Sequence, residues 1–329
     1  MDNLFVGIDI SKDKLDICIL DSAHTVVVAN AVFDNSHAGI KGLLKLLSVE
    51  GLNRYWVCME HTGHYGALLT SEFVQHQGKL SLINPVEIKR SSGLTRGKND
   101  AVDAYRIASY AASHTHKLTH FQLDNLALQE LKLKLAQRSF YTKAKVQAKN
   151  NLQSLKVLAQ SSDCEHELEV AKGFIDQYRR TIANIEKQIR ELIAKTPELQ
   201  TTFDKITKIP GVALVTAATC IVLTGNFTKF TNARKFCCHA GLAPFSHESG
   251  SSIKAPNRTS HFRNKALKAL LMRAGMTAGT HDPQLKAYKK RKRAEGKDKM
   301  VVNNALASKV VARIFAVAMR EEPYVKLAA

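Results

Sequence analysis

The sequence predicts a mixed α/β domain at the N-terminus, a long helical segment in the middle and a mainly α domain at the C-terminus. Residues 5–33 alternate apolar and polar side chains in strand-length runs, and strand-like and helix-like segments then alternate up to residue 85. Residues 123–196 contain one glycine and no proline, which favours long helices. We therefore expect three domains, over residues 1–118, 119–200 and 201–329.

The composition excludes several classes of protein. Of the 329 residues 45% are hydrophobic, which is ordinary for a globular chain. There is no uninterrupted apolar run of membrane-spanning length, and the N-terminus does not have the pattern of a signal peptide. The six cysteines form no CxxC pair, which indicates free thiols in a reducing cytosol. The triplet Cys237-Cys238-His239 has no second ligand pair at zinc-finger spacing, so we do not favour a zinc site.

The excess of positive charge lies in the C-terminal third. The whole chain has a net charge of +19. Residues 1–110 carry 11 basic and 12 acidic side chains, whereas residues 204–329 carry 23 basic and 7 acidic ones. So uneven a distribution favours a polyanionic partner such as nucleic acid over a merely solubilising surface, because natural surfaces usually mix both signs.

The predicted elements of the first domain follow from these patterns. Residues 5–21 predict two strands around a turn at Ser11-Lys12-Asp13. Further along the chain we expect a strand, a helix, a strand, a helix and a strand, over residues 25–33, 40–47, 55–60, 67–77 and 79–85. Such an arrangement is typical of a mixed sheet covered by helices.

Four carboxylates occupy positions in this domain where they could converge. Asp9 interrupts the first strand and Glu60 ends a later one, while Asp100 and Asp103 share one face of a helix. Clustered carboxylates suit a hard divalent cation, and such ions promote phosphoryl transfer. Taken singly, each has another interpretation: Asp9 as a turn residue, Glu60 as a solvent-exposed side chain and Asp100 as a helix N-cap.

The middle segment carries a heptad repeat. Apolar positions recur at alternating steps of three and four residues, and a break at Ser161-Ser162-Asp163 predicts that two helices fold back as a hairpin. The residues of this apolar seam are Leu168, Ala171, Ile175, Tyr178, Ile182, Ile185, Ile189 and Leu192. Its partner is either the preceding helix or another subunit.

The C-terminal segment opens with a short turn and continues with a basic loop. The sequence Ile209-Pro210-Gly211-Val212 between two helical runs resembles a helix-hairpin-helix, whose backbone N–H groups bind phosphate, although Ala213 stands where a second glycine is common. Residues 245–263 predict a polar loop, whose serines are by default turn residues. The run Lys289-Lys290-Arg291-Lys292-Arg293 predicts contact with phosphate or RNA, the alternative being a solvated helix face. A final helix over residues 301–319, apolar on one side, is expected to pack in the core.

Several of these segments together resemble a known family. GIDISKDKLD, VCMEHTGHY, LINP, GLTRGKNDAVDA and HESGSSIKAPNRTSH are similar to the signatures of bridge-RNA-guided transposases of bacterial insertion sequences, which are serine recombinases related to the Piv-type DNA invertases. The resemblance implies a ribonuclease-H-like (RuvC-like) first domain whose metal-binding residues are Asp9, Glu60, Asp100 and Asp103. It also implies that Ser249, directly after a glutamate, is the nucleophile, with Ser251 and Ser252 shaping the loop.

The same resemblance implies the activity and the partners. The chain is expected to be a bacterial cytoplasmic enzyme that recombines double-stranded target and donor DNA through a phosphoserine intermediate, with Mg²⁺ (or Mn²⁺) as cofactor, a structured noncoding guide RNA, a dimeric or tetrameric assembly and no membrane. The expected nucleic-acid-binding residues are Lys98, Arg258, Arg263, Lys289, Lys290, Arg291, Lys292 and Arg293. Two alternatives stay open at this point: a RuvC-like nuclease that uses water, and a non-catalytic architectural protein that binds nucleic acid.

Overall fold

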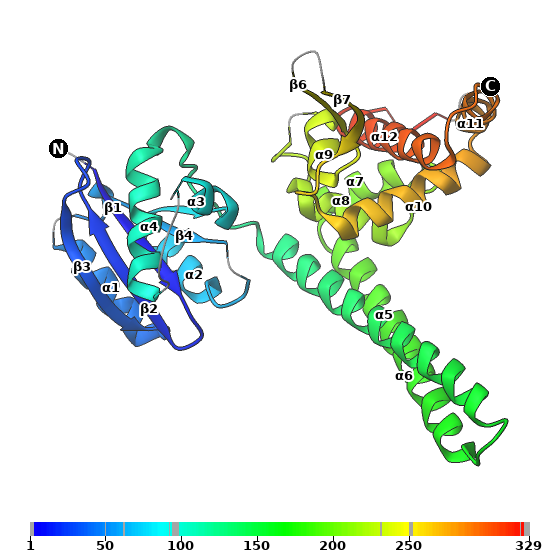
Figure 1. Ribbon diagram of the computed structural model, residues 1–329, viewed down its shortest axis with the longest axis horizontal. Helices are drawn as coiled ribbons and strands as arrows, with labels where there is room; N and C mark the ends of the chain where they lie inside the picture. Colours follow the sequence, from blue (N-terminus) through cyan, green and yellow to red (C-terminus); the bar gives the residue numbers. More distant parts are fainter. Residues whose placement is uncertain are drawn as a thin grey trace. The chain divides into compact units, whose positions relative to one another are not determined.

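The chain forms two compact units, residues 1–123 and 124–329, which we call unit 1 and unit 2 (Figure 1). The computed structural model describes residues 3–49, 51–61, 63–91, 93, 99–230, 232–249, 253–322 and 324–325. The predicted middle domain, residues 119–200, belongs by its contacts almost wholly to unit 2. Its separate role in oligomerisation stays a prediction.

Unit 1 is built on a five-stranded mixed sheet in the order β3-β2-β1-β4-β5. Strands β1, β2 and β3 pair in antiparallel fashion, whereas β4 and β5 continue the sheet from β1 as parallel strands. The bounds are β1 Leu4–Ile10, β2 Lys14–Leu20, β3 Val26–Asp34, β4 Tyr55–Glu60 and β5 Lys79–Ile83. The predicted mixed sheet and each of its five strands are therefore confirmed.

Helices cover both faces of this sheet, and the alternation of side chains along β1 shows which residues face which helix. Leu4, Val6 and Ile8 are buried in a core with residues of α1 (His37–Ser48) and α2 (Ala67–Gln75). Phe5 and Gly7 point to the opposite face, where α4 (Asp100–Ser113) packs and where the short α3 (Pro85–Ser91) contributes Ile88. Two 3-10 turns, Leu52–Arg54 and Thr115–Lys117, complete the unit. Asp9 therefore belongs to the face that α4 covers.

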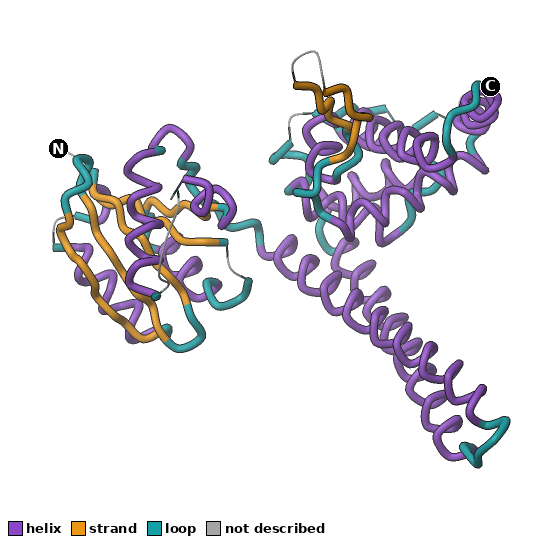
Figure 2. The backbone as a smooth tube through the Cα atoms, in the orientation of Figure 1, coloured by secondary structure: helices purple, strands orange, loops and turns teal. Residues whose placement is uncertain are grey.

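Unit 2 begins with a long antiparallel helical hairpin of α5 (Leu126–Leu158) and α6 (Glu165–Ala194), drawn in purple in Figure 2. Five seam positions are buried and the other three are half-buried along α6, as the heptad repeat predicts. Arg138 on α5 pairs with Glu186 on α6 at 2.7 Å, and the Tyr141 and Tyr178 rings lie 6.3 Å apart across the two helices. The partner of the seam is thus the preceding helix of the same chain.

In the described part of unit 2, six more helices and a pair of strands follow. The helices are α7 Pro197–Thr207, α8 Leu214–Thr224, α9 Ala233–Ala240, α10 Lys265–His281, α11 Pro283–Ala294 and α12 Lys299–Ala318. The expectation of a loop over residues 245–263 was wrong, because β6 (Pro244–Ser249) and β7 (Ile253–Thr259) pair in antiparallel fashion. These strands carry mostly polar side chains and two prolines, so apolar alternation could not reveal them.

The last helix, α12, is the one described helix that is long and apolar enough to span a membrane. Half of its apolar stretch is buried inside the protein. Leu306, Val310 and Ile314 lie in the same core as Leu271 and Ala278 of α10. Its hydropathy therefore reflects a core helix, as the sequence predicts.

Candidate functional site

The predicted carboxylates of unit 1 lie at one edge and on one face of the sheet. In the parallel pairing of β1 with β4, Ile8 lies opposite Met59, so Asp9 and Glu60 follow at the same carboxyl end of the two strands. Cys58 packs with Phe5 and Ile107 on the α4 side, and alternation places Glu60 on that side as well. Two of the four predicted metal ligands are thus neighbours on the α4 face.

Helix α4 contributes the other two carboxylates from its first turn. Asn99 is the N-cap and its Oδ1 accepts a hydrogen bond from the Val102 N–H at 2.8 Å, so the interpretation of Asp100 as the cap is wrong. Asp100 and Asp103 instead occupy the first turn, where the partial positive charge of the helix end favours carboxylates. A Cβ on Gly7 would collide with the carbonyl oxygen of Ala104, so glycine is what lets the helix lie this close to β1.

The electrostatics of Asp9 show that these carboxylates act on one another. Burial, followed by the negative charges of Asp103, Asp100 and Asp16, raises the pKa of Asp9 above its ordinary value. Asp16 on β2 lies directly opposite Asp9 in the antiparallel register and is only 4% exposed. It is a fifth carboxylate of the cluster that the sequence analysis missed. The hairpin turn at residues 11–13 was the signal that could have placed it there.

Two cations already neutralise part of this cluster. Lys14 Nζ lies 3.1 Å from Asp16 and 2.7 Å from Asp100, and an Arg106 NH1 group lies 2.7 Å from Asp103. Among the residues that the structure describes, no group of three or more His, Cys, Asp or Glu side chains is close enough to hold a metal ion. The oxygen donors fit a hard divalent cation by their chemistry. Binding such an ion would require Asp100 and Asp103 to exchange their contacts with Lys14 and Arg106 for contacts with the ion.

Ser249 is the last residue of β6 in unit 2. In the strand register it lies opposite Ile253, whereas Arg258 lies opposite Phe245 at the other end of the pair. Four residues of strand separate the two positions, which corresponds to roughly 13 Å. The exposed Arg258 is therefore not a neighbour of Ser249 along the hairpin. Ser251, Ser252 and Lys98 lie outside the described residues.

Two basic residues, Arg263 and Lys268, lie where β7 leads into α10. Arg263 is half-buried beside Gly241 and donates a hydrogen bond to the Ser260 carbonyl at 2.7 Å. Lys268 donates to the Gly241 carbonyl at 2.8 Å and to the Thr259 hydroxyl at 3.0 Å. Burial, and then the charge of Arg263, lowers the pKa of Lys268. Lys268 is a basic residue that the sequence analysis did not single out, and it holds the base of the hairpin in place.

The turn at residues 209–212 has the geometry that the sequence predicts. Gly211 adopts φ of 90° and approaches Ala274 of α10 so closely that a side chain there would collide with the backbone. The Val212 N–H donates to the Ile209 carbonyl at 3.0 Å, and both side chains are buried. Helix α8 then begins at Leu214 without a side-chain cap, and anion binding at this turn stays a prediction.

The basic run of residues 289–293 lies in the second half of α11. Lys292 pairs with Glu295 at 2.6 Å, and Arg293 donates to the Lys297 carbonyl at 2.6 Å. Arg291 lies 3.8 Å from Glu295. The run is therefore partly tied to the end of its own helix and is not a uniform array of solvated cations.

Comparison with known proteins agrees with these features. A transposase model of the DEDD type from IS110 matches residues 6–162, and a model of the IS116/IS110/IS902 transposase family matches residues 204–290. Pilin gene-inverting proteins of Moraxella bovis and Moraxella lacunata are each 28% identical over 334 residues, which cover 99% of both chains. An uncharacterized 43.6 kDa protein of insertion element IS110 from Streptomyces coelicolor is 32% identical over 111 residues, 34% of this chain and 27% of that one.

The fold, the carboxylate cluster and these matches define a DNA transposase or recombinase. The two models together cover well over half of the sequence, and the chain belongs to the IS110 family of transposases. A DEDD transposase domain implies a ribonuclease-H-like fold, and the sheet order of unit 1 with α4 across one face agrees with it.

Proposed function

We propose that this transposase cleaves and rejoins DNA through a phosphoserine link at Ser249, assisted by a divalent cation bound to Asp9, Glu60, Asp100 and Asp103. The observation that carries the proposal is the position of Asp9 beside the first turn of α4, where burial and then the charges of Asp103 and Asp100 raise the pKa of Asp9. Mutual repulsion of carboxylates lowers stability unless cations offset it, and groups with a perturbed pKa of this kind are common at functional sites.

The carboxylates would bind Mg²⁺ (or Mn²⁺) and so position the scissile phosphate. When bound, the ion would supply positive charge that stabilises the negative charge developing on the phosphate oxygens. Lys14 and Arg106 hold Asp100 and Asp103 in place without the ion. The pair of Lys14 on β2 with Asp100 would keep the first turn of α4 against the sheet in the free protein, whereas Arg106 pairs with Asp103 within α4.

The serine step exchanges one phosphate ester for another. The Ser249 hydroxyl oxygen attacks the phosphorus and forms a Ser–O–P bond, while the phosphorus–oxygen bond to the deoxyribose breaks. The serine proton is finally carried by the released sugar hydroxyl, so the step needs no oxidant, reductant or water. Attack on the phosphoserine by the hydroxyl of another strand reverses the step and rejoins DNA.

We further propose that the enzyme works as an oligomer on two double-stranded DNA partners, with an element-encoded structured RNA as guide. Recombination needs more than one active site in one assembly, and exposed aromatic residues support a subunit contact on the helical hairpin. Phe140 on α5 is 63% exposed and Phe174 on α6 is 49% exposed. Isolated exposed apolar residues are common, but a helical hairpin that carries several is suited to association. The RNA guide rests on the family resemblance alone.

A covalent-trapping experiment tests the serine mechanism. Wild-type protein, guide RNA, Mg²⁺ and labelled target DNA are mixed and resolved under denaturing conditions. We expect a labelled protein–DNA adduct with wild type and with the matched control Ser251→Ala, and none with Ser249→Ala. An adduct that persists in Ser249→Ala would refute the assignment, and strand cleavage by that variant without an adduct would favour the water-using nuclease.

Thermal denaturation tests the metal site without relying on activity. Asp9→Asn removes one of the repelling charges, so we expect the metal-free variant to be more stable than wild type by about 0.5–2 kcal/mol. Mg²⁺ should raise the melting temperature of wild type but not that of Asp9→Asn. Equal responses of both proteins to Mg²⁺ would contradict a site that includes Asp9.

A further inference from the structure

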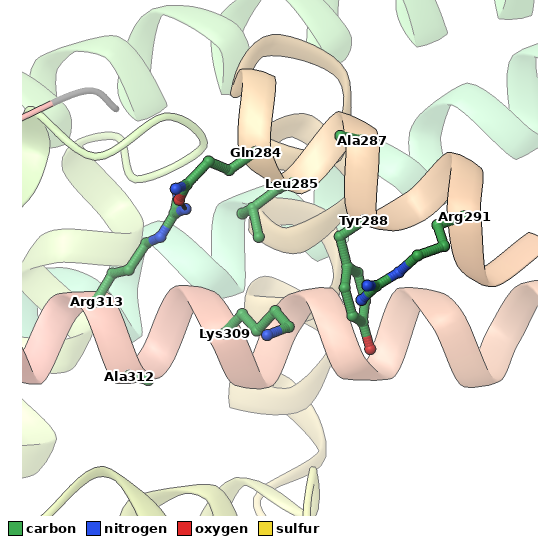
Figure 3. A pocket seen from close by; sticks show the side chains of 8 residues that line it. All are labelled: Gln284, Leu285, Ala287, Tyr288, Arg291, Lys309, Ala312 and Arg313. Carbon is green, nitrogen blue, oxygen red and sulfur yellow. Dashed lines mark hydrogen bonds between the residues drawn. The ribbon is translucent and has the colours of Figure 1, made fainter. Parts of the chain in front are cut away.

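A basic groove runs between α11 and α12 on the surface of unit 2, and we propose that it binds the phosphodiester backbone of a DNA strand. Figure 3 shows the side chains that line it, from Gln284 to Arg291 on α11 and from Lys309 to Arg313 on α12. The cavity has a volume of about 590 Å³. It would admit a segment of one strand but not a whole duplex. The proposal rests on the proposed function in one respect, because it takes DNA as the polyanion.

The positive charge of the groove comes from both helices. Lys309 of α12 is exposed, and its Nζ lies 4.6 Å from the centre of the Tyr288 ring. Arg291 lies 5.7 Å from the same ring. Tyr288 therefore gathers two cations at one point, which a cation–π contact favours. Among the described residues Lys309 has no carboxylate within ion-pair distance, so its charge is available to a phosphate.

A hydrogen-bond donor of fixed orientation lies at the other end of the groove. The guanidinium of Arg313 donates through NH1 to Asp282 at 2.7 Å and through NH2 to the Gln284 Oε1 at 2.9 Å. Because a guanidinium can only donate, the oxygen of the Gln284 amide must face Arg313. The NH₂ group of Gln284 then points away from Arg313 as a donor for a phosphate oxygen. Arg313 is thus a positioning residue, while Lys309 and Gln284 would contact the ligand.

The shape of the groove also suits a chain rather than a single small anion. Ala287 and Ala312, whose side chains are the smallest of the lining, contribute to it beside the polar side chains. A second cavity of about 160 Å³ shares Gln284 and Arg313 with the first and extends the groove along α12 past Ala316. Only Arg291 of the predicted basic run lines this groove. The proposed binding surface therefore includes only one residue of that run. It also depends on residues of α12, for which the sequence analysis predicted no contact with nucleic acid.

Two single substitutions, each of which removes one positive charge, test the proposal in the full-length protein. Lys309→Gln removes a cation that lines the groove. Lys286→Gln removes one from an exposed position of α11 that does not line it. Binding of labelled duplex DNA of random sequence is measured by fluorescence anisotropy over a salt series, with single-stranded RNA and polyglutamate as further probes. Melting temperatures of both variants verify that the fold is intact.

We expect Lys309→Gln to weaken duplex binding by about three- to tenfold near 0.1 M salt and to reduce the slope of log K against log salt by about 0.9. Lys286→Gln should leave that slope unchanged. Gln284→Ala should weaken duplex binding but should also leave the slope unchanged. Equal effects of Lys309→Gln and Lys286→Gln would overturn the proposal, as would a loss confined to RNA or to polyglutamate. Because no chemistry is measured, failure of the phosphoserine mechanism would leave these results unaffected.

Discussion

Asp282 shows how one buried carboxylate organises the C-terminal part of unit 2. It is 1% exposed and accepts hydrogen bonds from the Leu285 N–H at 2.9 Å, from Arg313 at 2.7 Å and from the Tyr324 hydroxyl at 2.8 Å. Burial alone would raise the pKa of Asp282, but these hydrogen bonds and the charge of Arg313 hold it below its ordinary value. One side chain thus caps α11 and joins it to α12 and to the C-terminal segment.

Asp282→Asn should lower the free energy of unfolding by about 2–4 kcal/mol at pH 7, because it leaves the charge of Arg313 uncompensated. A carboxylate whose pKa is lowered by folding stabilises the protein above its unfolded pKa, near 4. That contribution is lost as pH falls through the lower pKa of the folded state. The difference in melting temperature between wild type and Asp282→Asn should therefore shrink as the pH is lowered below about 4. A difference that stays constant over this range would contradict the ion pair.

At the scale of elements, the contact of α4 with β1 decides where the candidate metal ligands lie. Gly7 faces the helix backbone at Ala104 and Ala108, within the two turns that follow Asp100 and Asp103. The helix carries two carboxylates and the strand carries Asp9. The distance between these elements therefore sets the distance between the ligands.

Gly7→Ala should force α4 away from the sheet, because the added methyl group would meet main-chain atoms that cannot rotate aside. We expect a loss of about 1–3 kcal/mol in the free energy of unfolding and a loss of DNA recombination. Gly173→Ala is the matched control, since a Cβ on Gly173 meets nothing within 4 Å in the middle of α6. It should stabilise the protein by about 0.5–1 kcal/mol without impairing recombination. Similar effects of the two substitutions on stability would refute the close packing at Gly7.

At the scale of the whole molecule, the chain consists of two units with separate cores. Separate cores predict separate cooperative transitions in calorimetry. Gly7→Ala should lower only the transition of unit 1, and Asp282→Asn only that of unit 2, each by several degrees. A single transition that shifts with both substitutions would show that the units unfold together.

The oligomeric assembly is also a property at this scale. Replacing Phe140 and Phe174 together by serine should reduce the mass measured by light scattering, because it removes the largest exposed apolar side chains of the hairpin. Phe262, 63% exposed outside the hairpin, provides a control of the same residue type. Phe262→Ser should leave the mass unchanged. If the double variant also keeps the wild-type mass, the subunit contact does not involve these rings.

Local patterns in the sequence predicted most of the elements, but not the strands β6 and β7. The strands of unit 1, the break of the hairpin at residues 161–163 and the heptad seam of α6 all follow from local alternation or from 3.5-residue repeats, which need no knowledge of distant residues. Asp9, Glu60, Asp100 and Asp103 could likewise be chosen by their positions at strand ends and on one helix face.

Only the tertiary structure decided which surfaces meet. The seam of α6 packs on α5, Asp16 joins the carboxylate cluster, β6 pairs with β7, and Lys309 joins Arg291 around Tyr288. Each of these outcomes is a contact between residues that are far apart along the chain. For the seam of α6 it is also a choice between two apolar partners, the preceding helix and another subunit. Local pattern carries no information on such choices, because the free energy that decides them arises from burial and charge pairing in the folded protein.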